Sequence, residues 1–197
     1  MLFISKQGHV DAERVKLAIH PAIERGPMHK VNGIVVHQTG APTAKSTFNS
    51  YGNKSANGAH FLIDLDGTIY QTASLLRATA HVGLLRSRCL ETRKCSPVEI
   101  SAAAAKRGVR ALHKHEGKKE WPRRFPSNDD AIGIELVGNH RGPVGREIYD
   151  DVTDSQRISL KWLVSELAET LDVSMHEVYL HPEVSYKNET EARTAKW

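Results

Sequence analysis

The chain has 197 residues, of which 40% are hydrophobic and 25% charged, a balance typical of a folded globular protein rather than a disordered one. This length suits one domain with a sizeable core, and no apolar run approaches the roughly 20 residues that cross a bilayer. The apolar opening at residues 1–4 is too short for the hydrophobic core of a signal peptide. We therefore expect a cytoplasmic protein, or one exported by a signal-independent route.

The net charge of +4 is unevenly distributed along the chain. Residues 84–128 contain twelve Lys/Arg and four Asp/Glu, which gives this segment +8 and leaves −4 for the rest. A concentrated basic surface attracts polyanions such as nucleic acid, anionic lipid or an acidic cell-wall polymer, and the same charges also suit a solvated helical insertion.

Both cysteines, Cys89 and Cys95, lie in this basic segment. Their separation permits a small disulfide loop, and no CxxC pair indicates a cysteine zinc site.

Residues 1–30 are interpreted as a polar leader, with weak helical spacing from Val10 to Arg25 that Pro21 interrupts. Residues 31–37 are predicted to form a buried strand, followed by a turn-rich loop and a short helix at residues 46–51. Residues 60–65 are predicted to form a second strand. The dipeptide Asp66-Gly67 then turns the chain into residues 68–71, which is a strong β-hairpin signal.

The basic segment is predicted to be helical. Ser96, Pro97 and Glu99 form a helix start, and the helix is expected to continue through four alanines towards His113. Residues 121–126 hold two prolines and are expected to be a loop.

Residues 131–137 are predicted to form another buried strand, and residues 178–180 a last short one. Between them, residues 153–156 form a capping box that opens a helix. Its apolar stripe is expected to comprise Ile158, Trp162, Leu163, Leu167 and Leu171. Strands and helices thus alternate, which predicts a single α/β domain over residues 1–197 with a basic helical insertion at residues 84–128.

Two histidines follow predicted strands, where α/β folds place their chemistry. His37 closes the strand at residues 31–37, and His181 follows the strand at residues 178–180. Taken alone, His37 is more simply a satisfied core histidine, and the segment that contains His181 is more simply a solvated polar terminus. Glu135, however, lies on a buried strand, where a carboxylate is costly unless it is paired or functional. Together these residues indicate a zinc hydrolase site, which commonly has three protein ligands and leaves a fourth position to water.

Five segments in order resemble the zinc-dependent N-acetylmuramoyl-L-alanine amidases of the type 2 family. They are residues 33–39, 58–69, 80–83, 128–138 and the final stretch from His181 through Lys187 to Glu191. The similarity covers about residues 31–83 and 128–197. This family includes phage amidase lysozymes, bacterial wall-recycling amidases and peptidoglycan recognition proteins.

The resemblance implies a central mixed β-sheet flanked by helices and hydrolysis of the amide between N-acetylmuramic acid and the L-alanine of the stem peptide. It implies that His37 and His181 bind Zn²⁺. For the third ligand, Glu191 at +10 from His181 is favoured because a threonine precedes it, and Glu189 at +8 is the alternative. A glutamate at either place departs from the Asp or Cys that is more usual in the family.

The mechanism implied assigns Glu135 as the general acid and base and Lys187 as the group that stabilises the oxyanion. Phage members carry a tyrosine just before the histidine of the second strand, where this chain has Ala59. The role of that tyrosine is therefore either unfilled in this chain or taken by a residue from another segment, for which Tyr51 is the candidate. His60 is expected to pack behind the site and His81 to form a wall of the cleft.

The expected partner is peptidoglycan or a soluble muropeptide, bound by a monomer without membrane insertion. Nucleic acid is not expected, because the basic segment offers only Trp121 and Phe125 for stacking; binding of the wall polymer is the preferred function of this insertion. The alternative is a peptidoglycan-binding module without catalysis, although such modules usually lack the full ligand set. Phage endolysin, delivered antibacterial amidase and cytoplasmic recycling enzyme all remain compatible with the sequence.

Overall fold

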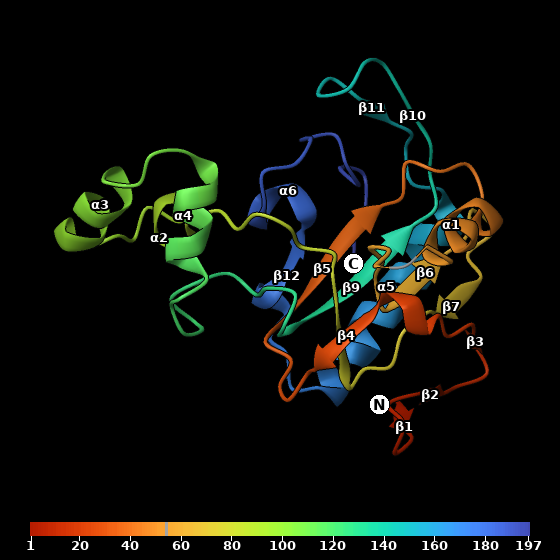
Figure 1. Cartoon of the computed structure of the whole chain (residues 1–197). Coiled ribbons are helices and arrows are strands. Elements are labelled where there is room, and N and C mark those ends of the chain that lie inside the picture. The colour runs from red at the N-terminus through yellow and green to blue at the C-terminus, as the bar shows by residue number, and fades with distance from the viewer. Residues whose placement is uncertain (54) are drawn as a thin grey trace.

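The computed structural model describes residues 1–53 and 55–197, and a six-stranded sheet lies at its centre (Figure 1). The strand order is β12 (Val178–Leu180), β5 (Gly33–Gln38), β9 (Ala131–Leu136), β6 (Phe61–Ile63), β7 (Ile69–Gln71) and β3 (Val15–Leu17). Only β6 and β7 pair antiparallel, and the other neighbours are parallel. The predicted mixed sheet within an α/β fold is confirmed.

Side-chain alternation on the central strands separates the core from the site. Ile34 and Val36 of β5 pack with Ile132 and Ile134 of β9 in the main hydrophobic core. The alternate residues of β5, Val35 and His37, face the other side of the sheet. The core face is covered by helix α5 (Asp154–Thr170).

Helix α5 begins where the sequence predicts, with Thr153 and Gln156 forming a capping box. Its buried stripe differs from the expected one. Ile158 is 65% exposed, whereas Leu160 and Val164 are fully buried. The helix is rotated so that these two residues, with Leu163 and Leu167, meet the sheet.

The predicted hairpin is present between β6 and β7, and its turn needs a glycine. Gly67 has a φ of +87°, and a Cβ there would lie 2.8 Å from the carbonyl oxygen of Ser155. The short helix predicted at residues 46–51 is α1 (Ala44–Tyr51), which starts slightly earlier because Thr43 caps it.

Residues 1–30 are an integral part of the fold, and the helical spacing expected between Val10 and Arg25 is wrong. This part forms β1 (Phe3–Ile4), β2 (Val10–Asp11), β3, the 3-10 helix η1 (Pro21–Ile23) and β4 (Glu24–Pro27). Strand β3 pairs with the edge of β7, and the side chain of Gln71 accepts a hydrogen bond from Val10 N at 2.7 Å. The free edge of β7 offers backbone partners that outweigh a weak local helical pattern.

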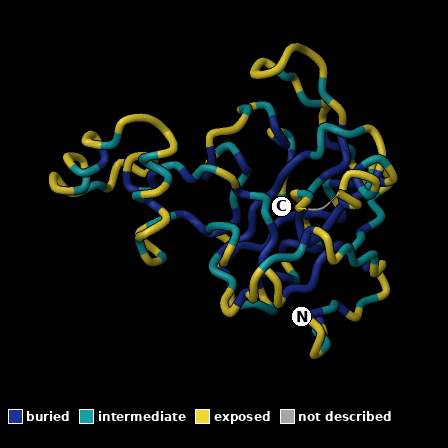
Figure 2. Tube along the Cα trace, viewed as in Figure 1, coloured by how far each residue is buried: buried dark blue, intermediate teal, exposed yellow. Residues whose placement is uncertain are grey.

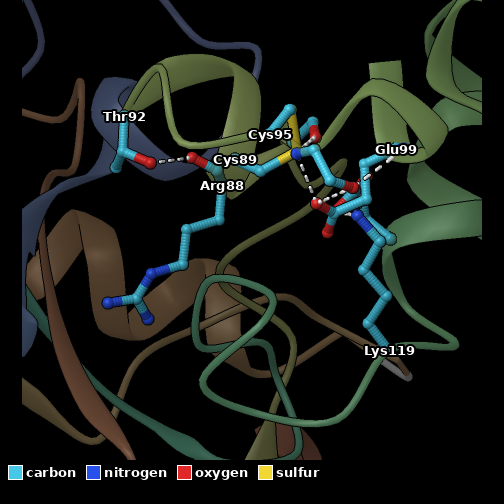
Figure 3. The surroundings of a disulfide bond; sticks show 9 residues. Arg88, Cys89, Thr92, Cys95, Glu99 and Lys119 are labelled. Atoms are coloured by element: carbon cyan, nitrogen blue, oxygen red, sulfur yellow. Dashed lines mark hydrogen bonds and ion pairs between the residues drawn. A yellow bond between two sulfur atoms is a disulfide. The ribbon is translucent and has the colours of Figure 1, made fainter. Parts of the chain in front are cut away.

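Residues 84–128 form three helices that lie beside the sheet, and we call them the α2–α4 lobe (Figure 1). The helices are α2 (Arg88–Glu91), α3 (Pro97–Ala104) and α4 (Val109–Glu116). The single helix expected towards His113 is therefore wrong: α3 ends at Ala104, and Gly108, with a φ of +83°, is the N-cap residue from which α4 begins. A disulfide joins Cys89 and Cys95 (Figure 3).

The remaining elements lie around the central sheet. They are β8 (Arg77–Thr79), which pairs with β4, the hairpin of β10 (His140–Arg141) and β11 (Ile148–Tyr149), the 3-10 helix η2 (Met175–Glu177) and α6 (His181–Val184). Burial is concentrated in the sheet and α5, whereas the lobe and the β10–β11 hairpin are largely exposed (Figure 2). Within the described residues, no helix is both long and apolar enough to span a membrane.

Candidate metal centre and active site

Three adjacent parallel strands bring the predicted site residues together. His37 on β5 and Glu135 on β9 are direct register partners. Strand β12 pairs with the other edge of β5, with Leu180 opposite Val36, so His181 follows at the same end of the sheet. Adjacent parallel strands in register place these side chains on one face.

Glu191 completes a buried group with the two histidines. Its Oε1 lies 2.8 Å from Nδ1 of His181 and 3.7 Å from Nδ1 of His37. One ligand-type atom from each residue lies within 4.8 Å of those of the other two. Glu189 is exposed at the surface, so the geometry favours Glu191 over Glu189 as the third ligand.

The outer nitrogen of His181 determines where its lone pair points. Nε2 lies 2.9 Å from the carbonyl oxygen of Val82, which can only accept a hydrogen bond. In the neutral ring Nε2 therefore carries the proton. The lone pair on Nδ1 then faces the carboxylate of Glu191.

A relay through His81 imposes the same tautomer on His37. Nε2 of His81 donates to the carbonyl oxygen of Ala131 over 3.1 Å, so its Nδ1 accepts. The partner of that Nδ1 is Nε2 of His37, at 2.9 Å. His37 therefore also presents an unprotonated Nδ1 towards Glu191. The expectation that His81 is a wall of the cleft is met, and the residue in addition orients a candidate ligand.

Two imidazole lone pairs and a carboxylate oxygen thus converge on one point. Burial, with a contribution from His181, lowers the pKa of His37 to about 4, so the ring is neutral at pH 7. Converging electron pairs repel one another unless a cation lies between them, and nitrogen with oxygen ligands suits zinc. The donor set fits a zinc ion.

Glu135 stands beside this group in a different environment. Burial raises the pKa of Glu135 to about 7, although a hydrogen bond from Tyr51 opposes the shift. The hydroxyl of Tyr51 donates to Oε2 of Glu135 over 2.5 Å. Burial and Glu135 also raise the pKa of this tyrosine well above its usual value, so it remains a donor.

Tyr51 reaches Glu135 from the end of α1, not from the position that Ala59 occupies. The ring passes over Gly58, where a Cβ would lie 2.8 Å from Cε1 of Tyr51. From the sequence, Tyr51 is only a candidate replacement for the missing tyrosine; in the structure its hydroxyl lies against the carboxylate of Glu135.

The site opens into a cavity of about 300 Å³ that contains both expected catalytic residues. Its lining includes Glu135 and Lys187, and also Tyr149, which no sequence motif marked as a site residue. Asn128 is likewise missed: its Oδ1 accepts hydrogen bonds from His81 N and Val82 N. Asn128 lies within a segment that carries the family resemblance, and this is the only sequence signal that marks it.

His60 lies behind the site, as expected. Its Nδ1 accepts from Gly133 N at 3.0 Å and its Nε2 donates to the carbonyl oxygen of Arg77 at 2.9 Å. Burial lowers its pKa to about 4. The ring is fully hydrogen-bonded and has no free atom for a ligand.

Residues 27–195 match the sequence profile of a family described as N-acetylmuramoyl-L-alanine amidase. The chain belongs to this amidase family. No curated protein sequence gives a significant match to the amidase.

Solved structures of low sequence identity share the fold of this amidase. A selenomethionine derivative of AmpD is 16% identical with a TM-score of 0.60, and the match covers 100% of this chain and 96% of that one. PlyL is 16% identical with a TM-score of 0.53, covering 88% and 83%. The catalytic domain of XlyA is 20% identical with a TM-score of 0.52, covering 88% and 87%.

Proposed function

We propose that this member of the family is a zinc-dependent hydrolase of the amide bond between N-acetylmuramic acid and the L-alanine of the peptidoglycan stem peptide. Membership of the family supports amide hydrolysis on peptidoglycan. The observation that carries the proposal is the convergence of two imidazole Nδ1 atoms and the Glu191 carboxylate beside Glu135, the register partner of His37.

His37, His181 and Glu191 would hold the zinc ion. When bound, zinc supplies the Lewis-acid chemistry that makes water a nucleophile near neutral pH. Glu135 accepts the proton from the attacking water and delivers it to the departing alanine nitrogen. A pKa of about 7 suits both steps, because the carboxyl group exchanges a proton readily near that pH.

Two further groups support this transfer. Lys187 lines the cavity, and its ammonium group stabilises the negative charge that develops on the carbonyl oxygen. Tyr51 orients the Glu135 carboxylate through its hydroxyl and keeps one oxygen free for the proton transfer.

A peptidoglycan-binding module without catalysis is the alternative function on this fold. Burying a carboxylate costs stability, and a module that only binds peptidoglycan does not need a partly buried carboxylate with a raised pKa. The arrangement of Glu135 and Tyr51 therefore favours the enzyme.

Digestion of purified sacculi, and separately of a soluble anhydro-muropeptide, tests the proposal. Mass spectrometry should find new free amino termini on L-alanine, and the activity should be lost on chelation and restored by zinc. Products cleaved at any other bond would refute the assignment. The preferred substrate separates wall lysis from recycling.

A further inference from the structure

Helix α3 lies at the outer end of the α2–α4 lobe (Figure 1), and it exposes apolar side chains. Val98 is 77% exposed and Ile100 is 51% exposed. Among the eight residues of α3 only Ala103 is buried, and the one charged residue, Glu99, is engaged in the capping box with Ser96. Large apolar side chains that are exposed together on a helix mark a surface that protein or lipid covers.

The disulfide continues this apolar surface from α3 to α2 (Figure 3). Cys89, Leu90, Cys95 and Ile100 line a hollow of about 290 Å³, with Arg93 as its cationic member. The bond between Cys89 and Cys95 holds α2 against the start of α3. The apolar surface is therefore fixed in place and does not depend on a mobile loop.

The basic residues of the lobe fall into two groups. Those in the first group form ion pairs that build the lobe or attach it to the domain: Arg86 with Glu91, Arg88 with Glu177, Lys119 with Glu116, and Arg124 with Asp130. Within the described residues, the second group forms no ion pair; its members are Arg93, Lys94, Lys106, Arg107, Arg110, Lys114, Lys118 and Arg123.

The second group brackets the apolar helix. Arg93 and Lys94 precede α3, and Lys106 and Arg107 follow it. Apolar side chains between cations are typical of a segment that lies at a membrane interface, where the apolar groups enter the headgroup region and the cations meet lipid phosphates.

The aromatic side chains of the lobe are not available for sugar rings or bases. Phe125 is buried, and Trp121 donates through Nε1 to Glu177 at 3.3 Å while Lys30 lies over its ring. The lobe therefore offers no aromatic surface on which the sugar rings of the wall polymer could stack, so this expected function of the insertion has no support from its aromatic residues. Charge complementarity together with exposed apolar groups favours lipid.

We propose that the α2–α4 lobe docks on the surface of an anionic phospholipid bilayer. Helix α3 lies at the headgroup level, and the unpaired cations beside it contact lipid phosphates. The attachment is peripheral, and it is independent of the hydrolytic site.

Sedimentation of the full, disulfide-bonded chain with vesicles tests this proposal. The protein should bind vesicles of phosphatidylglycerol and phosphatidylcholine and should not bind phosphatidylcholine alone. Added salt should weaken the binding, because each cation near an anionic surface contributes about fivefold. The double variant Lys106→Glu/Arg107→Glu should therefore bind at least about 25-fold more weakly.

The apolar contribution is tested separately. Val98→Ser/Ile100→Ser should weaken binding to anionic vesicles about tenfold or more. Matched controls lie away from the lobe: Val144→Ser, at a residue that is 98% exposed, and Lys6→Glu/Lys45→Glu, which changes the net charge by the same amount as the lobe variant. Both controls should bind like wild type.

Several results would overturn the proposal. They are an absence of binding to anionic vesicles, equal binding to neutral vesicles, and equal effects of the lobe and control variants. Attachment to purified sacculi that needs Lys106 and Arg107, without attachment to vesicles, would assign the surface to the wall polymer instead. Unchanged cleavage of a soluble muropeptide by each variant shows that it is folded.

Discussion

Replacement of Glu135 by Gln separates the chemistry of this residue from its effect on folding. Gln keeps the shape and can still accept the hydrogen bond from Tyr51, but it cannot take a proton from water. Turnover should fall by about 10²–10⁴-fold, the usual contribution of a general acid–base group. The zinc content should not change, because the proposed ligands are His37, His181 and Glu191.

The same substitution should stabilise the metal-free protein at alkaline pH. The pKa of Glu135 is raised from an ordinary 4.5 to about 7, so the folded state binds this proton more tightly than the unfolded chain. The stability that protonation provides is complete below about pH 4.5 and is lost as the pH rises through about 7. A shift of this size corresponds to at most about 3 kcal/mol at pH 8.

Chemical denaturation of metal-free wild type and Glu135→Gln, from pH 5 to pH 8, measures this difference. The variant should be the more stable at pH 8, and the two curves should converge towards pH 5. Glu189→Gln, at an exposed site, is the matched control and should follow wild type throughout. Turnover by Glu135→Gln equal to that of wild type would remove Glu135 from the mechanism, and parallel stability curves would refute the raised pKa.

The other predictions concern the remaining groups of the site. The purified protein should hold about one zinc ion per chain, and Glu191→Ala should lose metal and activity together while Glu189→Ala keeps both; metal analysis with the opposite result would move the third ligand to Glu189. Lys187→Ala should retain zinc and lose about 10²–10³-fold in turnover, as expected for a missing oxyanion donor. Tyr51→Phe should retain zinc but move the acidic limb of the pH–rate profile to higher pH, because the lost hydrogen bond lowers the pKa of Glu135 in the wild type; a limb that stays in place or moves to lower pH would contradict this role.

Local signals in the sequence were sufficient for several elements. The Asp66-Gly67 turn, the capping box at Thr153 and the buried strand that ends near His37 all depend on residues close together in the chain. The same holds for the candidate ligands His37 and His181, since both follow apolar runs that could only be strands of the core.

Contacts between distant segments decided the rest. The residues after Val10 have a weak helical pattern, but residues 15–17 form a strand because they pair with the edge of β7. The buried residues of α5 depend on the rotation of this helix, which places Leu160 and Val164 against the sheet. The expected long helix in the lobe is divided in two: α3 ends at Ala104, and Gly108, with its positive φ, precedes α4.

The chemistry of the site shows the same division. The sequence by itself determined which residue types were available and which of them would lie at the ends of strands. Only the tertiary structure decided that the carbonyl oxygen of Val82 and the ring of His81 would direct both histidine lone pairs towards Glu191. It also decided that Tyr51 would reach Glu135 from α1. Hydrogen bonds depend on distance and direction in space, and neither is set by separation along the chain.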